Sequence, residues 1–240
     1  MLINDTLNKS GDANMLCTAN EDQGMSFYLL GDTLSFQKRY YSSESNYKQL
    51  YIDRYDLLIL GQTDTSIIVK PISKLSKEFF SHRPNITFVR QEFNWDRSIV
   101  FEKIIYHSSD CLGGCPTIDL EIKGRNVYLK GQFYKEDSIN YFNSEIDTIQ
   151  SGEFISILSD SLYNELINIL QTSSLRTLTF PEHHGYDAGV TTLIIYYNGK
   201  RKYLQSMFPP TISNRLVDFL HYINTRADLK RTFKKRKIER

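Results

Sequence analysis

The chain has 240 residues with 29 basic and 28 acidic side chains, and its formal net charge of +1 excludes a protein that acts as a polyelectrolyte. A chain of this length buries about 70% of its unfolded surface, so it needs neither disulfides nor a metal to fold. No apolar run approaches the ~18 residues of a membrane span, and the first 24 residues lack the basic and then apolar pattern of an export signal.

The N-terminal part of the chain is predicted to be a flexible segment followed by a small, mainly β unit. Residues 1–24 are polar and interrupted by Gly and Asn, which indicates irregular structure. Residues 25–98 contain short runs rich in Ile, Leu, Tyr, Phe and Thr, which predict strands. Breaks are expected at 31–32, 61–62 and 83–84, and one or two helical turns capped by Ser73 are expected over 73–82.

Two hairpins are predicted in the next part, residues 99–225, after a strand within 98–109. In the first, over 117–134, alternation places Ile118, Leu120 and Ile122 on one face and Thr117, Asp119, Glu121 and Lys123 on the other. The second, over 190–205, has the dipeptide Asn198-Gly199 at its turn, where a type I′ turn needs positive φ at both residues. In that register Tyr196 lies opposite Arg201, and Ile194 lies opposite Tyr203.

Two amphipathic helices complete this part. The first is capped by Ser159 or Ser161, and the second lies within 211–225. Their apolar stripes are formed by Leu162, Leu166, Ile169 and Leu170 and by Ile212, Leu216, Phe219, Leu220 and Ile223. Because strands and helices do not alternate regularly, we predict an α+β fold: antiparallel sheets with helices packed on one face, preceded by the smaller mainly β unit.

The last part, residues 226–240, is a basic C-terminal tail. It holds eight Lys or Arg against two acidic residues, a net of +6, which leaves −5 for residues 1–225. A solvated helix end or frayed terminus is the favoured interpretation, and contact with nucleic acid through this tail is the alternative. Since Phe233 is its only aromatic residue, the tail offers no stacking platform for single strands, and nucleic-acid binding is disfavoured.

The loop 108–122, "SSDCLGGCPTIDLEI", contains two of the three cysteines and has three interpretations. His107, Cys111 and Cys115, joined by His183 or His184, would supply metal ligands, but zinc sites usually use two cysteine pairs. A reactive thiolate is disfavoured because the loop leads into a strand and lies beside an aspartate. We favour a structural turn with thiols packed inside or, outside the cytosol, joined as a disulfide; its residues are Cys111, Gly113, Gly114, Cys115 and Pro116.

The string Cys111-Leu112-Gly113-Gly114-Cys115-Pro116, followed by a hairpin, a helix, Asp187 before another hairpin and a final helix, resembles an uncharacterised domain of unknown function with a C-x-G-x-C-P signature. The resemblance covers residues 99–225, about half of the chain. It implies a small α+β domain at these positions and no mechanism.

A second loop, "PEHHGYDAG" at 181–189, brings His183, His184 and Asp187 close in sequence. Histidine titrates near neutrality and a carboxylate can orient it, so ligand binding or acid–base chemistry is one interpretation. A polar surface loop is the favoured one, because adjacent histidines in an extended chain point to opposite sides.

No hydrolase, zincin or nucleotide-binding signature occurs. We therefore expect a non-enzymatic binding or protein-interaction module with no cofactor or metal, whose partner is a protein or a small molecule. The alternative is a metal- or thiol-dependent enzyme that uses the Cys111/Cys115 loop and the His183/His184 loop. Three cysteines, an odd number, fit a reducing compartment and a cytoplasmic location; a secreted or envelope-attached protein whose signal was removed would have the same sequence.

Overall fold

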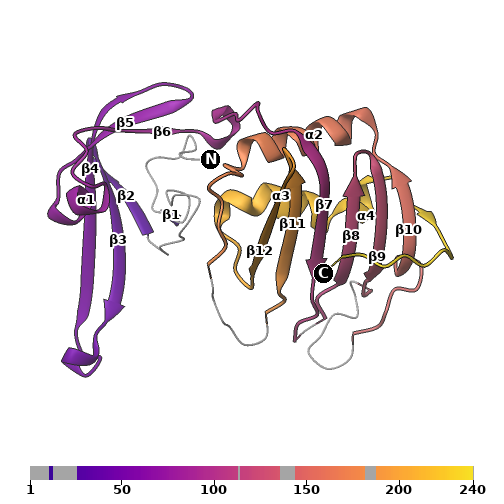
Figure 1. Ribbon diagram of the computed structural model, residues 1–240. Helices are drawn as coiled ribbons and strands as arrows, with labels where there is room; N and C mark the ends of the chain where they lie inside the picture. The colour runs from indigo at the N-terminus through magenta and orange to yellow at the C-terminus, as the bar shows by residue number, and fades with distance from the viewer. Residues whose placement is uncertain (1–10, 13–25, 113, 136–143, 182–187, 240) are drawn as a thin grey trace. The chain divides into compact units, whose positions relative to one another are not determined.

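The computed structural model describes residues 11–12, 26–112, 114–135, 144–181 and 188–239 (Figure 1). The chain forms two compact units, Met1–Trp95 and Asp96–Arg240. The boundary thus lies three residues before the one expected from the sequence. The sheets are antiparallel throughout and the helices of the second unit lie on one face of its sheet, so the predicted α+β fold is confirmed.

The first unit is a six-stranded sheet whose strands lie in chain order. They are β1 (Gly11–Asp12), β2 (Ser26–Leu30), β3 (Thr33–Tyr41), β4 (Leu50–Gln62), β5 (Ser66–Pro71) and β6 (Ile86–Val89), with helix α1 (Lys74–Phe79) and 3-10 turns at Ser43–Ser45 and Gln91–Phe93. The predicted cap of α1 is confirmed, since Ser73 accepts a hydrogen bond from the Ser76 amide. The core consists of Leu34, Phe36, Leu57, Ile67 and Val69.

One sequence expectation for this unit is confirmed and one is corrected. β4 ends at Gln62, within the break expected at 61–62, and its register with β5 shifts at a bulge where Leu60 is the extra residue between the paired Ile59 and Gly61. Within the segment expected to be flexible, Gly11 and Asp12 form β1 by pairing with β2.

The second unit is a seven-stranded sheet with the order β12-β11-β7-β8-β9-β10-β13. The strands are β7 (Phe101–Ser108), β8 (Thr117–Lys123), β9 (Asn126–Gln132), β10 (Gly152–Ile157), β11 (Thr191–Tyr197), β12 (Lys200–Ser206) and β13 (Lys230–Arg231). Both predicted hairpins are confirmed: β8 pairs with β9 from Thr117 to Lys123, and in the second hairpin Tyr196 pairs with Arg201 and Ile194 with Tyr203. Asn198 and Gly199 have φ of 52° and 68°, as a type I′ turn requires.

The helices of the second unit are α2 (Asp160–Thr172), α3 (Asn214–His221) and α4 (Ile223–Arg226), with a 3-10 turn at Thr211–Ser213. Ser159 caps α2 by accepting a hydrogen bond from the Leu162 amide. The single helix expected over 211–225 is instead divided at Tyr222, yet its apolar stripe still faces the core: Leu216, Phe219, Leu220 and Ile223 are buried. None of the described helices is long and apolar enough to cross a membrane.

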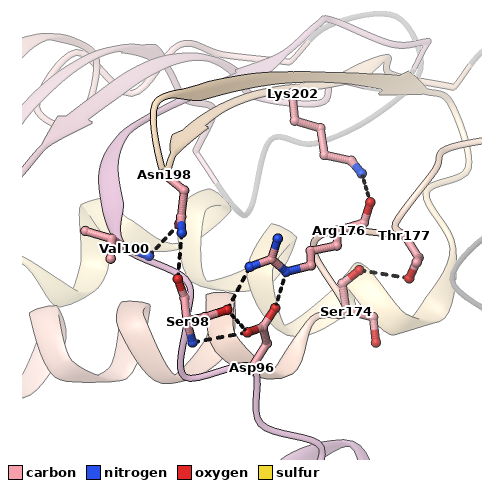
Figure 2. A network of polar contacts seen from close by, with 8 residues as sticks. All are labelled: Asp96, Ser98, Val100, Ser174, Arg176, Thr177, Asn198 and Lys202. Atoms are coloured by element: carbon pink, nitrogen blue, oxygen red, sulfur yellow. Dashed lines mark hydrogen bonds and ion pairs between the residues drawn. The ribbon is translucent and has the colours of Figure 1, made fainter.

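A polar network ties the beginning of this unit to its second hairpin (Figure 2). The Arg176 guanidinium donates to Asp96 and to Ser98, both over 2.7 Å. Hydrogen bonds from Ser98 and then Arg176 lower the pKa of Asp96. Asn198 donates to the Ser98 carbonyl over 2.7 Å and accepts from the Val100 amide over 2.8 Å. The network therefore fixes where β7 enters the sheet.

Candidate functional site

The seven-stranded sheet has one face against helices and one that none of the described helices covers. Tyr106 of β7 lies on the helical face, where its hydroxyl is 2.9 Å from Nδ1 of His221 in α3. Burial raises the pKa of Tyr106 to about 12 and lowers that of His221. Because strand side chains alternate, the neighbours Ile105 and His107 lie on the opposite face. We call this second face the open face.

Residues 232–239, which we call the crossing segment, run over the open face after β13, the last strand of the sheet, has paired with β10 (Figure 1). This corrects the expectation of a solvated tail. Within the segment, Phe233 is 92% exposed, whereas Ile238 is only 8% exposed. Ile238 packs in a small apolar cluster with Ile105, Tyr128 and Ile194. Burial of such a side chain typically stabilises a fold by about 1.5–3 kcal/mol.

Glu239 is the segment's second anchor. Its carboxylate accepts hydrogen bonds from the Tyr196 hydroxyl over 2.6 Å, from Lys103 Nζ over 3.0 Å and from Arg201 Nε over 3.0 Å. These donors, the Tyr196 hydroxyl first, lower the pKa of Glu239 to about 2. One carboxylate thus joins the segment to β7, β11 and β12.

A third anchor lies three residues earlier in the segment. An Arg236 guanidinium nitrogen is 2.7 Å from Oε1 of Glu121, a carboxylate whose side chain is only 8% exposed. The Arg236 amide donates to the Tyr128 hydroxyl over 3.0 Å. Tyr128 in turn donates to Glu153 over 2.8 Å, and burial and this carboxylate raise its pKa.

His107 connects the crossing segment to the rest of the open face. Its Nδ1 lies 2.6 Å from Oδ1 of Asp119, and its Nε2 lies 2.7 Å from the carbonyl oxygen of Glu239. Both partners, a carboxylate and a backbone carbonyl, can accept hydrogen bonds from the imidazole ring. While the segment is in place, neither ring nitrogen is available to a ligand.

A groove of about 1010 Å³ runs across the open face beside the crossing segment. Its lining spans the strands from β12 to β10, which at roughly 4.8 Å per strand makes it about 24 Å long. The floor is mostly neutral and hydrogen-bonding, and Tyr203, 47% exposed, offers one aromatic face. Lining residues that we use below are His107, Asp110, Asp119, Lys130, Glu153, Thr192, Tyr203 and Gln205.

One hydrogen bond orders the groove, and three lining side chains join it to the surface that the crossing segment occupies. Gln205 donates to Thr192 over 3.0 Å, which holds this pair of adjacent strands in a fixed orientation. His107, Asp119 and Lys130 also line a smaller cavity of about 520 Å³ whose other wall is residues 236–239. The groove and the segment therefore share three side chains.

The cysteine loop lies between β7 and β8. Cys111 and Cys115 form a disulfide with a Cα–Cα distance of 5.2 Å. Gly114 has φ of +79°, and a Cβ at this position would lie 2.5 Å from Oγ of Ser144. Gly113 lies outside the described residues, and Pro116 leads into β8. The loop is thus a closed turn in which glycine is required by conformation and by space.

The ligand set that the sequence suggested is not assembled by the residues the structure describes. His107 contacts Asp119 and Glu239, while Cys111 and Cys115 contact each other. His183, His184 and Asp187 lie outside the described residues. Within the described ranges, no group of three or more His, Cys, Asp or Glu side chains is placed to hold a metal ion.

Sequence reasoning placed Thr117, Asp119 and Glu121 together on one face but did not identify the open face as a site. The alternation of polar and apolar residues in 117–123 was the sequence signal that indicated a polar face on this strand. Tyr203 and Gln205 follow the same alternation in β12. Nothing in the sequence indicated that residues 236–239 contact these strands.

Comparison of the chain with protein-family models, with curated proteins and with solved structures gave no match. The resemblance of residues 111–116 to a C-x-G-x-C-P domain therefore stays a hypothesis based on those residues and on the order of the elements.

Proposed function

We propose that the Asp96–Arg240 unit is a non-enzymatic binding module whose ligand lies in the groove of the open face. The observation that supports this most directly is the groove itself, which is long, crosses the strands and has a floor of hydrogen-bonding side chains. Concave sites with a few convergent polar groups are the usual places where proteins bind ligands.

The lining favours an oligosaccharide as the class of ligand. A bound peptide usually needs apolar pockets for anchoring side chains, and among the described residues the groove's aliphatic lining is limited to Ile146 and Val190. A nucleic acid is disfavoured because three carboxylates, Asp110, Asp119 and Glu153, face the groove. A neutral chain rich in hydroxyl groups matches the amide, hydroxyl and carboxylate side chains and can stack a sugar ring on Tyr203.

The disulfide bears on the competing function and on location. A metal- or thiol-dependent enzyme would need free thiolates at Cys111 and Cys115, which here are bonded to each other. Disulfides persist mainly in oxidising compartments. This favours the second location considered above, that of a secreted or envelope-attached protein, where oligosaccharides are abundant ligands.

Titration calorimetry of the full chain with cellohexaose, xylohexaose and chitohexaose tests the proposal. We expect saturable binding of at least one of them, and we expect Tyr203→Ala and Gln205→Ala to weaken it by roughly tenfold or more, the loss of about 1.4 kcal/mol. Tyr41→Ala is the matched control, because Tyr41 is a similarly exposed tyrosine in the first unit.

Three results would contradict the proposal. If none of the three oligosaccharides binds, the ligand class is wrong. If an oligosaccharide binds and is cleaved, as chromatography of the mixture after incubation would reveal, the unit is an enzyme. Binding that Tyr203→Ala leaves unchanged would place the site elsewhere.

A further inference from the structure

The crossing segment is held to the open face in the way a bound peptide is held, and this observation is independent of the groove ligand. Between residues 232 and 239 the segment is extended and lies across the strands. Its backbone contacts with the sheet are few: Thr232 donates to the Glu153 carbonyl over 2.9 Å, the Arg236 amide donates to the Tyr128 hydroxyl over 3.0 Å, and the Glu239 carbonyl accepts from His107. Side chains supply the rest of the attachment.

Three anchors fall within four consecutive residues of the segment. Arg236 pairs with Glu121, Ile238 enters the apolar cluster, and Glu239 is held by its three donors. Lys237, between them, is exposed. The recognised pattern is therefore a basic residue, any residue, an aliphatic residue and an acidic residue. These four residues have the length of a short linear motif.

The surfaces that receive these anchors belong to the sheet and are positioned without the segment. Glu121, which receives the basic anchor, lies in the centre of β8, and Lys103, which receives the acidic anchor, lies in β7. Arg201, also at the acidic anchor, is fixed by the hairpin of β11 and β12. Opposite charges thus lie at the two ends of a preformed site, with an apolar socket between them, and a preformed site lowers the ordering cost of binding.

The attachment is small compared with that of the core elements. Ile238 is the segment's one buried hydrophobic side chain among the described residues, and Phe233, Lys234 and Lys235 are exposed. Segments with few buried apolar contacts open locally far more often than a domain unfolds. The site can therefore be vacated while the sheet stays intact.

We propose that the face beneath residues 236–239 is a docking site for an extended segment of a partner protein with the pattern Arg-x-Ile-Glu, and that this chain's own residues occupy it as an exchangeable intramolecular ligand. A partner then binds when the crossing segment is released. Release also frees Nε2 of His107 toward the groove, so occupancy of the docking site and of the groove are coupled through His107, Asp119 and Lys130.

The test uses the full chain and a fluorescein-labelled peptide of residues 232–239, TFKKRKIE, followed by fluorescence anisotropy. The Ile238→Asp chain, whose own segment cannot dock, should bind this peptide with an affinity roughly tenfold or more higher than the unaltered chain does. In the unaltered chain the crossing segment competes with the peptide for the same site. A scrambled peptide of the same composition controls for charge. Circular dichroism and Tm check that the Ile238→Asp chain is folded. If it is not folded, the Glu239→Arg chain is used instead.

A charge exchange then locates the contact. Arg201→Glu in the Ile238→Asp chain should weaken binding of TFKKRKIE, and the peptide TFKKRKIR should restore part of the loss. Equal anisotropy with the authentic and the scrambled peptide, or a loss that TFKKRKIR does not restore, would overturn the docking site. These outcomes leave the oligosaccharide experiment unaffected, so the two proposals fail separately.

Discussion

At Glu239 a single side chain connects the crossing segment to three strands, and its low pKa makes that connection depend on pH. In the folded protein its pKa is about 2, below the ordinary value of 4.5. A carboxyl group whose pKa is lowered on folding stabilises the fold above its unfolded pKa, and this stabilisation is lost as the pH falls toward the folded pKa. The window for Glu239 is therefore pH 4.5 down to about 2.

We predict that Glu239→Gln lowers the Tm at pH 7 and that the difference from the unaltered chain shrinks steadily between pH 5 and pH 3. Neutral glutamine keeps the shape of the side chain but removes the charge that Lys103 and Arg201 recognise. Scanning calorimetry across this range checks the prediction, with Glu78→Gln in α1 as the control. A difference in Tm that does not change with pH would show that packing, and not charge, holds Glu239.

At the same scale, the sequence identified Cys111 and Cys115 as architectural without deciding between packed thiols and a disulfide. Both interpretations need the turn that Gly114 provides, and residue order alone cannot fix the distance between two side chains. The disulfide closes a loop of only five residues, so it restricts the unfolded chain less than a long-range bridge would, by about 2 kcal/mol in the chain-entropy model. Its contribution is local, to the shape of the loop beside the groove.

Among the elements, the hairpin of β11 and β12 shows why some structure could be read from the sequence. The dipeptide Asn198-Gly199 fixes the turn type, the turn type fixes the register, and alternation then fixes which side chains share a face. The helices were predicted for the same reason, because an apolar stripe needs only local spacing. β10 was missed, since its short run begins at Gly152 and its pairing with β9 crosses a long connection.

Asn198 also joins this hairpin to the network of Figure 2, and the two roles can be separated. We predict that Asn198→Gly, which keeps the positive φ but loses the bonds to Ser98 and Val100, lowers the free energy of unfolding by about 1–3 kcal/mol. Asn198→Ala should cost roughly 1 kcal/mol more, because alanine is strained at φ of 52°. Urea unfolding measures both variants. Equal losses for the two would mean that the backbone conformation contributes nothing.

For the whole molecule, the crossing segment is the feature that could not be predicted from the sequence. A run such as residues 234–237, Lys-Lys-Arg-Lys, has the composition of a solvated tail, and the charge pattern predicts nothing about its partners. The partners of the segment lie far away in the sequence, from 38 residues for Arg201 and Glu239 to 136 residues for Lys103 and Glu239. Only the completed sheet brings Glu121, the apolar cluster and Lys103 into one row that matches the segment.

This arrangement leads to a prediction about which residues make up the second folding unit. The fragment 96–240 has its own core and should unfold cooperatively without residues 1–95. The fragment 96–228 lacks β13 and the crossing segment, so its Tm should be roughly 5–10 °C lower, since the burial of Ile238 alone is worth about 1.5–3 kcal/mol. Phe233→Ala in the longer fragment is the control and should leave the Tm unchanged, because that side chain is 92% exposed. Equal melting temperatures for the two fragments would show that residues 229–240 are the solvated tail that their composition predicts. That result would also remove the physical basis for a docking site on the open face.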